Sequence, residues 1–425
     1  MSVRLITPAR GPVSGTVHIP GSKSITNRAL VLGALADGRT VIEGALFSDD
    51  TGLMAEGLRG LGFAIEEESQ AERFVVQGEG GRIPAGEARI DAGNAGTVAR
   101  FLTAVAALGF GEYLVDGSAR MRQRPILDLL LALRALGSDA VAPSGCPPVR
   151  LRARGLAGGR ATVRGGVSSQ FLSALLQVAP LAESRVELLV AGPLVAGPYA
   201  DLTLGMMRLF GATVQRDDAH RYTITPQRYA SRAFSVEPDA SSASYFFAAA
   251  AATGGRVTVS GLARDSLQGD VKFLDVLRAM GCAVEWGDEG VTVHGPERLR
   301  GVDVDLNAMS DMTMTLAALA PFAEGPVRIR NVGHIRHQES DRLSGLVAEL
   351  RRLGQEVRES EDGLEIIPQP VRPAVVETYG DHRIAMAFAV AGLRANGVAI
   401  VNPECVTKTF PDFFRRLEAL VASER

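Results

Sequence analysis

A motif that ends in glycine recurs at nearly constant spacing along the 425-residue chain. Apolar-periodic runs close on Leu-Arg-x-Leu-Gly or a near variant, and a β-like run follows each of them. Five clear copies end at Gly62, Gly137, Gly211, Gly281 and Gly354, at separations of 75, 74, 70 and 73 residues. A degenerate sixth copy lies at Phe413–Leu420. Such even spacing predicts six similar units of about 72 residues each.

A second kind of helix is predicted in phase with the first. Its starts are small or polar residues, at Ser22, Asn94, Ser168, Ser241, Ser310 and Asp381. Segments such as FLSALLQVAPLA carry almost no charge, which predicts burial on most sides, whereas LVAELRRLG is amphipathic. Short β-like runs with turn glycines, such as RVTVSG, separate the helices. Each unit is therefore predicted to be an α/β mixture with one interior helix.

Six such units fit either a closed solenoid or two globular halves. Three units already occupy about 215 residues, near the usual limit for a single core, which favours two halves of three units. The break between the halves is expected at residues 232–238, where Pro238 restricts its neighbour, and a second crossing at residues 18–21. We therefore predict one domain at 22–234 and one at 1–21 plus 235–425.

Composition limits the class of function. The 45 Lys and Arg against 48 Asp and Glu give a net charge of −3, which argues against a general nucleic-acid binder. No apolar run approaches the ~18 residues of a membrane span, and the first residues lack an apolar signal segment. We expect a cytoplasmic protein without a membrane or nucleic-acid partner. Three dispersed cysteines predict neither a disulfide framework nor a metal site.

The interior helices begin with polar signatures that suit anions: GSKSITNR, GNAGT, VSSQ, DASS, SDMT and GDHR. A helix start offers unpaired N–H groups and a partial positive charge. Ordinary N-capping explains any one start, but six in phase predict a convergent anion site. Lys23 follows Gly21 without the spacing of a Walker A loop, which excludes a P-loop NTPase.

Charged residues near these starts include anion binders and acid–base candidates. Arg120, Arg122 and Arg124 stand in a predicted loop and suit a carboxylate or phosphate, although a solvated basic turn fits equally well. Asp311 and Glu339 are the strongest general acid–base candidates, because each stands at a helix start beside residues suited to anions. Helix capping or an ion pair with a neighbouring arginine is the plain alternative.

Eight segments, in order, carry a family resemblance: GSKSITNRAL, GNAGT, RQRP, VSSQFLSALL, SDMTMTLAA, QESDRL, YGDHRIAMA and KTFPDFF. Together they resemble the 3-phosphoshikimate 1-carboxyvinyltransferase (5-enolpyruvylshikimate-3-phosphate synthase) family of enolpyruvyl transferases. The resemblance implies a two-domain inside-out α/β barrel of six βαββαβ repeats, three per domain, with the active site in the interdomain cleft.

The resemblance also implies a reaction. The enolpyruvyl group of phosphoenolpyruvate would pass to the 5-hydroxyl of shikimate 3-phosphate with release of phosphate, a step of the shikimate pathway toward chorismate and the aromatic amino acids. It implies addition and elimination through a tetrahedral intermediate, without a metal or an organic cofactor. A glyphosate-sensitive monomer is expected.

The family's site residues are carried over motif by motif. Catalysis is implied for Asp311, Glu339 and Lys23, with the proton carried by each left open. Shikimate 3-phosphate binding is implied for Lys23, Ser24, Arg28, Ser168, Ser169, Gln170, Tyr199, Asp311, His334 and Gln338. Phosphoenolpyruvate binding is implied for Lys23, Asn94, Gly96, Arg124, Gln170, Arg342, His382, Arg383 and Lys408.

Three positions depart from the family pattern. Ala196 stands where many relatives carry serine, Gln338 where many carry lysine, and His334 where asparagine is frequent. The loss of a lysine charge at 338 bears on affinity for shikimate 3-phosphate, although glutamine still donates a hydrogen bond.

Two alternatives stay open at this level. The sister enolpyruvyl transferase acts on UDP-N-acetylglucosamine, and its reactive cysteine has no counterpart in the segment SARMRQRP at 118–125. A non-catalytic anion or RNA-end binder built on related repeats would have no use for Asp311 and Glu339.

Overall fold

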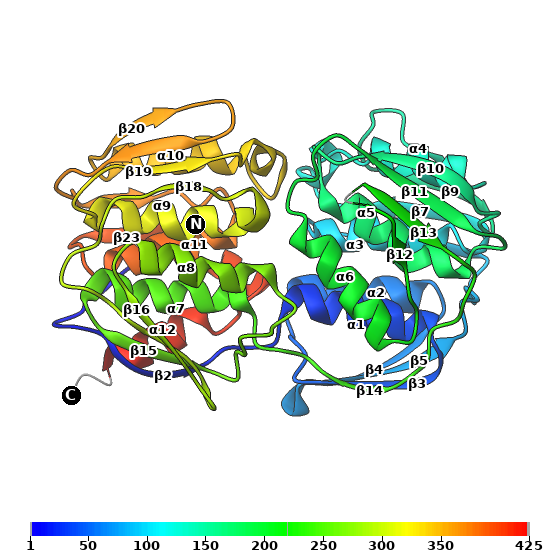
Figure 1. The fold of residues 1–425 in the computed structure, drawn as a ribbon, viewed down its shortest axis with the longest axis horizontal. Helices are drawn as coiled ribbons and strands as arrows, with labels where there is room; N and C mark the ends of the chain where they lie inside the picture. Colours follow the sequence, from blue (N-terminus) through cyan, green and yellow to red (C-terminus); the bar gives the residue numbers. More distant parts are fainter. Residues whose placement is uncertain (1, 219, 423–425) are drawn as a thin grey trace. The chain divides into compact units, whose positions relative to one another are not determined.

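The computed structural model describes residues 2–218 and 220–422. The chain divides into two compact units, one formed by Gly21–Val236 and the other by Met1–Pro20 together with Glu237–Arg425. We call the first the continuous unit and the second the split unit. Figure 1 shows the helices α1 to α6 in the continuous unit and α7 to α12 in the split unit.

The continuous unit alternates helices and short strands. Its helices are α1 (Lys23–Leu35), α2 (Asp49–Gly60), α3 (Gly96–Ala106), α4 (Leu127–Ala135), α5 (Ser169–Val178) and α6 (Pro198–Leu209). Its strands are β3 (Asp37–Glu43), β4 (Ala64–Glu68), β5 (Arg73–Glu79), β6 (Glu87–Asp91), β7 (Phe110–Asp116), β8 (Asp139–Val141), β9 (Val149–Arg154), β10 (Gly159–Arg164), β11 (Val186–Ala191), β12 (Gln215–Arg216), β13 (Arg221–Ile224) and β14 (Ala233–Ser235). Its 3₁₀ helices are η1 (Ser69–Ala71), η2 (Met121–Gln123) and η3 (Ala179–Leu181).

The split unit has the same kind of content. Its helices are α7 (Ala240–Thr253), α8 (Phe273–Ala279), α9 (Thr313–Leu319), α10 (Arg342–Arg352), α11 (His382–Gly392) and α12 (Phe413–Ala422). Its strands are β1 (Val3–Leu5), β2 (Ser14–His18), β15 (Arg256–Ser260), β16 (Ala283–Gly287), β17 (Gly290–His294), β18 (Asp303–Asp305), β19 (Val327–Arg330), β20 (Glu356–Glu359), β21 (Leu364–Ile367), β22 (Ala374–Val376) and β23 (Val398–Val401). Its 3₁₀ helices are η4 (Gly269–Lys272), η5 (Asn307–Met312), η6 (Ala320–Phe322), η7 (Gly333–His337) and η8 (Pro403–Lys408).

Six sheets in the described part of the chain confirm the six predicted units. Five are four-stranded and share one pattern, with orders β6-β7-β9-β8, β10-β11-β13-β12, β14-β3-β5-β4, β2-β15-β17-β16 and β18-β19-β21-β20. In each, the first two strands pair in parallel and the rest pair antiparallel. The sixth sheet, β22-β23-β1, has three strands.

The order of elements inside a repeat differs from the expected βαββαβ. Along the chain, β6, α3, β7, α4, β8 and β9 follow one another, which is βαβαββ. A parallel strand pair needs a crossover such as α3, whereas the antiparallel strands β8 and β9 need only a short connection. The two last strands therefore follow the second helix directly.

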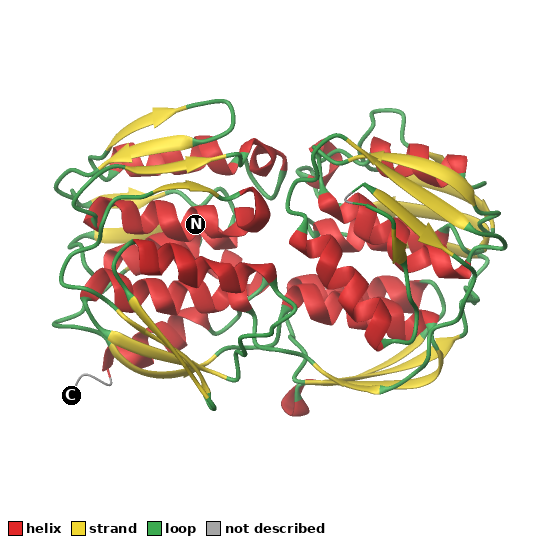
Figure 2. Ribbon diagram, in the orientation of Figure 1, coloured by secondary structure: helices red, strands yellow, loops and turns green. Residues whose placement is uncertain are grey.

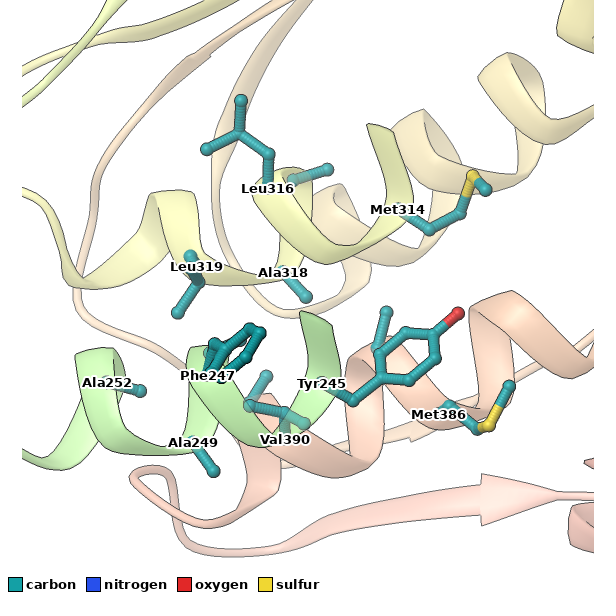
Figure 3. Packing of buried hydrophobic residues seen from close by; sticks show 14 of the residues in the cluster. Tyr245, Phe247, Ala249, Ala252, Met314, Leu316, Ala318, Leu319, Met386 and Val390 are labelled. Carbon is teal, nitrogen blue, oxygen red and sulfur yellow. The ribbon is translucent and has the colours of Figure 1, made fainter. Parts of the chain in front are cut away.

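The interior of each unit is built from the uncharged helices. Nearly every residue is buried in α1, α3 and α5, and likewise in α7, α9 and α11, which confirms the prediction of one interior helix per repeat. Figure 2 shows the helices at the centre of each unit and the strands at its periphery. Figure 3 shows α7, α9 and α11 meeting through residues such as Phe247, Leu319 and Val390. Each unit is thus an inside-out α/β body. Across residues 2–218 and 220–422, no helix has both the length and the apolar character to cross a membrane.

The recurring glycines end the outer helices as the motif predicts. Gly62, Gly137, Gly211, Gly281 and Gly354 all have φ between +87° and +104°. After α2, Gly62 N donates to Arg59 O and Phe63 N donates to Leu58 O, which is the Schellman pattern. The same pair of bonds closes α4, α6, α8 and α10.

Candidate active site

Helix starts in the continuous unit gather the predicted anion-binding residues. Ser22 precedes α1 without capping it, and its buried hydroxyl has no hydrogen-bond partner. No side chain caps α3 either, whereas Ser168 caps α5 by accepting from Gln170 N at 3.2 Å. Ordinary N-capping thus explains the start of α5 but not the starts of α1 and α3. The partial positive charge at the N-termini of α1 and α3 favours the binding of an anion there.

Lys23 stands at the first position of α1. Its Nζ lies 3.3 Å from Oδ2 of Asp50, whose side chain is only 2% exposed. Asp50 lies in the first turn of α2, which packs against α1. We did not single out Asp50 from sequence, because an aspartate in the first turn of a helix is common and its partner is distant along the chain.

Arg28 is a fully buried cation. Its Nε donates to Thr203 Oγ1 at 2.8 Å and its other nitrogens donate to the carbonyls of Ser24 at 2.9 Å and Tyr199 at 3.1 Å. No carboxylate lies within ion-pair distance of Arg28 among the residues described. Burial lowers the pKa of Arg28 to about 10. A cation buried without a carboxylate is costly, so this position favours an anionic ligand.

Arg124 lies at the end of η2 and is 3% exposed. Its Nη1 donates to Asn94 O at 2.9 Å and to Asn94 Oδ1 at 3.3 Å. A Cβ added at Gly96 would lie 2.6 Å from Arg124 Nη2 and 2.9 Å from Gln170 Oε1. Four predicted residues, Asn94, Gly96, Arg124 and Gln170, therefore meet at the start of α3.

The other two arginines of the predicted basic loop lie elsewhere. Arg122 forms a two-bond ion pair with Asp116, at 2.9 and 2.7 Å, and its side chain is 56% exposed. Arg120 donates to Gln123 Oε1 at 3.5 Å. Of the three, Arg124 is buried, Arg120 is half-buried and Arg122 is exposed, so binding of an anion by this loop stays a prediction.

Helix starts in the split unit gather the predicted acid–base residues. Asp311 accepts from Arg342 Nη1 at 3.0 Å and from Arg383 Nη2 at 2.8 Å. It belongs to η5 rather than to an α-helix, because Met309 has non-helical φ and ψ and α9 begins only at Thr313. The predicted α-helix start at Ser310 is therefore displaced by three residues.

Arg342 is the centre of this group. Its guanidinium, 1% exposed, contacts Asp311, Glu339 at 2.9 Å and Asp381 at 2.8 Å. Gln338 Oε1 also accepts from Arg342. Burial lowers the pKa of Arg342, but the three carboxylates outweigh it and raise that pKa overall. Asp381, which the sequence predicts only as a helix start, is a further member of this group.

Two histidines and a lysine complete the group. His334 Nε2 lies 2.9 Å from Ser310 Oγ, and burial lowers the pKa of His334 to about 4, so its ring is neutral at neutral pH. His382 is the first residue of α11 and is fully buried, with Nδ1 3.6 Å from Asp381 Oδ1. Lys408, 8% exposed, ends η8, which packs on α11.

Each unit thus holds one group of predicted residues. The continuous unit holds Lys23, Ser24, Arg28, Asn94, Gly96, Arg124, Ser168, Ser169, Gln170 and Tyr199. The split unit holds Asp311, His334, Gln338, Glu339, Arg342, His382, Arg383 and Lys408. Buried guanidinium and ammonium groups suit phosphate and carboxylate, and the paired carboxylates suit proton transfer. No cluster of three or more His, Cys, Asp or Glu residues fit to hold a metal occurs in the described part of the chain.

Comparison with known proteins agrees with this chemistry. The sequence model of the family "EPSP synthase (3-phosphoshikimate 1-carboxyvinyltransferase)" matches residues 8–417. A 3-phosphoshikimate 1-carboxyvinyltransferase of Trichormus variabilis is 48% identical over 413 residues, covering 96% of this chain and 97% of the relative. The chloroplastic one of Brassica napus is 46% identical, covering 96% and 83%. A solved EPSP synthase structure from Acinetobacter baumannii superposes with a TM-score of 0.81 at 25% identity, covering 99% and 98%.

Proposed function

The chain belongs to the EPSP synthase (3-phosphoshikimate 1-carboxyvinyltransferase) family, and from that membership we propose how its two groups of residues act. The enzyme transfers the enolpyruvyl group of phosphoenolpyruvate to the 5-hydroxyl of shikimate 3-phosphate and releases inorganic phosphate. The observation that carries the assignment is the family match from residue 8 to residue 417, which includes every residue of both groups.

The continuous unit supplies most of the contacts to shikimate 3-phosphate. Its phosphate suits Arg28, which has no carboxylate partner among the described residues. We assign to this substrate Lys23, Ser24, Arg28, Ser168, Ser169, Gln170 and Tyr199, with Asp311, His334 and Gln338 from the split unit.

Phosphoenolpyruvate carries a carboxylate and a phosphate, so it needs several cations. Arg124, Arg342, Arg383 and Lys408 supply them together with Lys23. Asn94, Gly96, Gln170 and His382 complete this set. The crowding at Gly96, where a Cβ would meet Arg124 and Gln170, supports a role of Gly96 in admitting the ligand and glyphosate.

The reaction is an addition followed by an elimination. The 5-hydroxyl oxygen bonds to C2 of phosphoenolpyruvate and loses its proton, while the methylene carbon gains a proton to become a methyl group. The resulting tetrahedral intermediate returns a methyl proton and expels phosphate. We assign the base at the 5-hydroxyl to Asp311, the proton donor and acceptor at the methyl carbon to Glu339, and charge stabilisation to Lys23.

The departures from the family pattern are compatible with these roles. Gln338 accepts a hydrogen bond from Arg342, which a lysine ammonium cannot do. His334, neutral at neutral pH, lies on Ser310 and offers a ring nitrogen in place of an amide. The charge that other members place at 338 is thus replaced by a polar group that supports Arg342.

The partners, localisation and oligomeric state of the protein are also part of the proposal. The net charge of −3 supports a protein that acts on small anions and not on nucleic acid. We assign it to the cytoplasm, as a monomer without a bound cofactor.

Release of phosphate from phosphoenolpyruvate tests the proposal. The purified protein is supplied with shikimate 3-phosphate, with UDP-N-acetylglucosamine, or with no acceptor. We expect release with shikimate 3-phosphate alone. Release with the nucleotide sugar alone would replace the substrate assignment, and release with neither would favour a non-catalytic binder.

Asp311→Asn tests the catalytic assignment in the same assay. The amide keeps an acceptor for an arginine but cannot take a proton, so turnover should fall by ~10² or more, with binding of shikimate 3-phosphate retained. The control is Asp303→Asn, which removes an exposed ion pair with Arg330 in the same unit and should change turnover less than about twofold. Near-normal turnover of the Asp311 variant would refute its role.

A further inference from the structure

The turn that precedes α11 leads directly into two residues of the proposed site and is held by α10, the helix that begins at Arg342. Residues 377–381 join β22 to α11, and the next two residues are His382 and Arg383. The body of α10, which begins at Arg342, lies against this segment. Two separate clasps join the turn to α10.

The first clasp lies at the start of α10. Arg342 Nε donates to Asp381 Oδ2 at 2.8 Å, and Asp381 Oδ1 in turn accepts from Arg383 N at 3.0 Å. Ser340 Oγ also donates to Asp381 Oδ2 at 3.1 Å, and Asp311 accepts from both Arg342 and Arg383. These contacts join the two helix starts at their ends and leave the middle of the turn to be held by other residues.

The second clasp lies two helical turns further along α10. Glu349 follows Arg342 by seven residues, so both side chains project from the same face of the helix. Glu349 is fully buried, its Oε2 accepts from Glu377 N at 3.0 Å, and its Oε1 accepts from Tyr379 OH at 2.8 Å. The buried carboxylate is thus held by the backbone and side chain of the turn together with Arg352 of α10, whose Nε lies 3.0 Å from Glu349 Oε2.

Tyr379 needs such a clasp because of its own backbone. Its φ of +55° lies in the left-handed region, which is unfavourable for a residue with a Cβ. Its ring covers Gly345 of α10, where an added Cβ would lie 3.3 Å from Tyr379 Cδ2 and Cε2. The residue is 44% exposed, so it contributes little to the core. A strained, exposed tyrosine bonded to a buried carboxylate is the mark of a residue that fixes a turn.

We infer that Glu349 and Tyr379 are positioning residues that set the start of α11 against α10, and with it the placement of Arg383 relative to Arg342. The inference rests on the proposed function, since those two arginines are assigned to phosphoenolpyruvate. When the Tyr379–Glu349 bond is lost, the turn relaxes from its left-handed conformation. Arg383 then moves relative to Arg342, while the groups that hold shikimate 3-phosphate in the continuous unit keep their places.

Tyr379→Phe tests this inference with little risk to the fold, because the ring and its packing on Gly345 remain. The change removes the hydrogen bond to the Glu349 carboxylate, so we expect KM for phosphoenolpyruvate to rise about tenfold or more. KM for shikimate 3-phosphate should rise clearly less, because most of its proposed contacts come from the continuous unit. The matched control is Tyr113→Phe, which removes a 2.7 Å bond to Ala85 O in the continuous unit and should leave both constants unchanged.

A double variant tests whether Tyr379 acts through Glu349. In the Glu349→Leu background, which has no acceptor for the tyrosine hydroxyl, Tyr379→Phe should raise KM for phosphoenolpyruvate by less than about twofold, because the clasp is already broken. Independent effects of the two changes would overturn the inference. So would an unchanged KM for phosphoenolpyruvate in Tyr379→Phe, or equal rises in both KM values.

Amide hydrogen exchange separates failure of the inference from failure of the proposed function. If the wild-type protein releases no phosphate, the function assignment fails while the clasp can still be measured. The amide of Asp381, bonded to Thr378 O at 2.8 Å, and that of Arg383 should exchange about tenfold faster in Tyr379→Phe. Unchanged exchange at these amides would refute the clasp in either case.

Discussion

Two buried arginines of the proposed site differ in the charge of the groups that they contact. Arg342 contacts three carboxylates, whereas Arg28 has only neutral oxygen acceptors, and burial lowers the pKa of Arg28 to about 10. A carboxylate network holds a charge in place before a ligand arrives, but neutral acceptors leave the charge for the ligand to balance. Arg28 is therefore the residue whose supports should matter most for the affinity of an anion.

Thr203 accepts a hydrogen bond from Arg28, and this acceptor can be removed by an isosteric substitution. Thr203→Val keeps the side-chain volume but leaves Arg28 Nε without its 2.8 Å acceptor in a buried place. Loss of a hydrogen bond to a charged group costs about 1.5–3 kcal/mol, so KM for shikimate 3-phosphate should rise about tenfold. Steady-state kinetics with each substrate varied in turn check this, and KM for phosphoenolpyruvate should change much less.

Thr103→Val is the control for that change. Thr103 is equally buried and its hydroxyl donates to Ala99 O, the same bond within a helix that Thr203 makes to Tyr199 O, but it holds no arginine. Its replacement should leave both KM values unchanged. If the two threonine variants behave alike, the assignment of Arg28 to shikimate 3-phosphate loses its support.

Sequence motifs predicted the candidate site residues of each unit, but they did not predict the ion-pair partners of those residues. Lys23 and Arg342 were both expected, because their motifs are distinctive. Their partners Asp50 and Asp381 were not chosen, because each pairs through helix packing with a residue at least 27 positions away. An ion pair of that kind leaves no periodic or local signal in the chain.

At the scale of elements, the recurring helix ends were the most predictable feature. The left-handed backbone at C′ favours glycine, so a glycine marks the end of the helix in each of these repeats. The start of α9 was not predictable in the same way. Met309, with φ −139° and ψ 50°, breaks the helical course, yet no glycine or proline announces the break.

Gly211 offers a clean test of the helix-end argument. A Cβ at this residue would find its nearest neighbour, Ala230 Cβ, at 3.7 Å, so Gly211→Ala meets no steric clash. Its φ of +89° still disfavours alanine, and we expect a loss of about 1–2 kcal/mol in the free energy of unfolding. Urea denaturation of the whole protein measures this change.

The matched control is a glycine inside a helix. Gly52 lies within α2, and a Cβ there would meet nothing within 4 Å. Gly52→Ala should stabilise the protein by about 0.5–1 kcal/mol, because alanine is the better helix former. Effects of the same sign at both glycines would contradict the explanation by backbone conformation.

At the scale of the whole molecule, the chain path makes the two units unequal. The continuous unit contains all twelve strands of its three sheets between Gly21 and Val236. The split unit instead takes β1 and β2 from the first twenty residues, where β2 forms the edge of β16-β17-β15-β2 and β1 the edge of β1-β23-β22. We propose that the predicted domains, residues 22–234 and residues 1–21 plus 235–425, fold as these units.

Separate expression of the two parts tests that proposal. Residues 21–236 should unfold in one cooperative thermal transition, because none of their strands comes from outside. Residues 237–422 alone should not, because they lack the buried side chains of Ile6, Val13 and Val17. Each such side chain contributes about 1.5–3 kcal/mol when fully buried, and domains are stable by only about 5–15 kcal/mol.

Joining the missing strands to the other end of the split unit should restore it. Arg4 forms an ion pair with Glu418 of α12, and its guanidinium lies 4.7 Å from the centre of the Phe414 ring, so the first strand lies beside the last helix. A glycine-rich linker of about ten residues between 422 and 2 therefore spans the gap. The fusion 237–422–linker–2–20 should regain cooperative unfolding by circular dichroism. Cooperative unfolding of 237–422 without residues 2–20 would instead show that the two N-terminal strands are dispensable and would shift the proposed boundary.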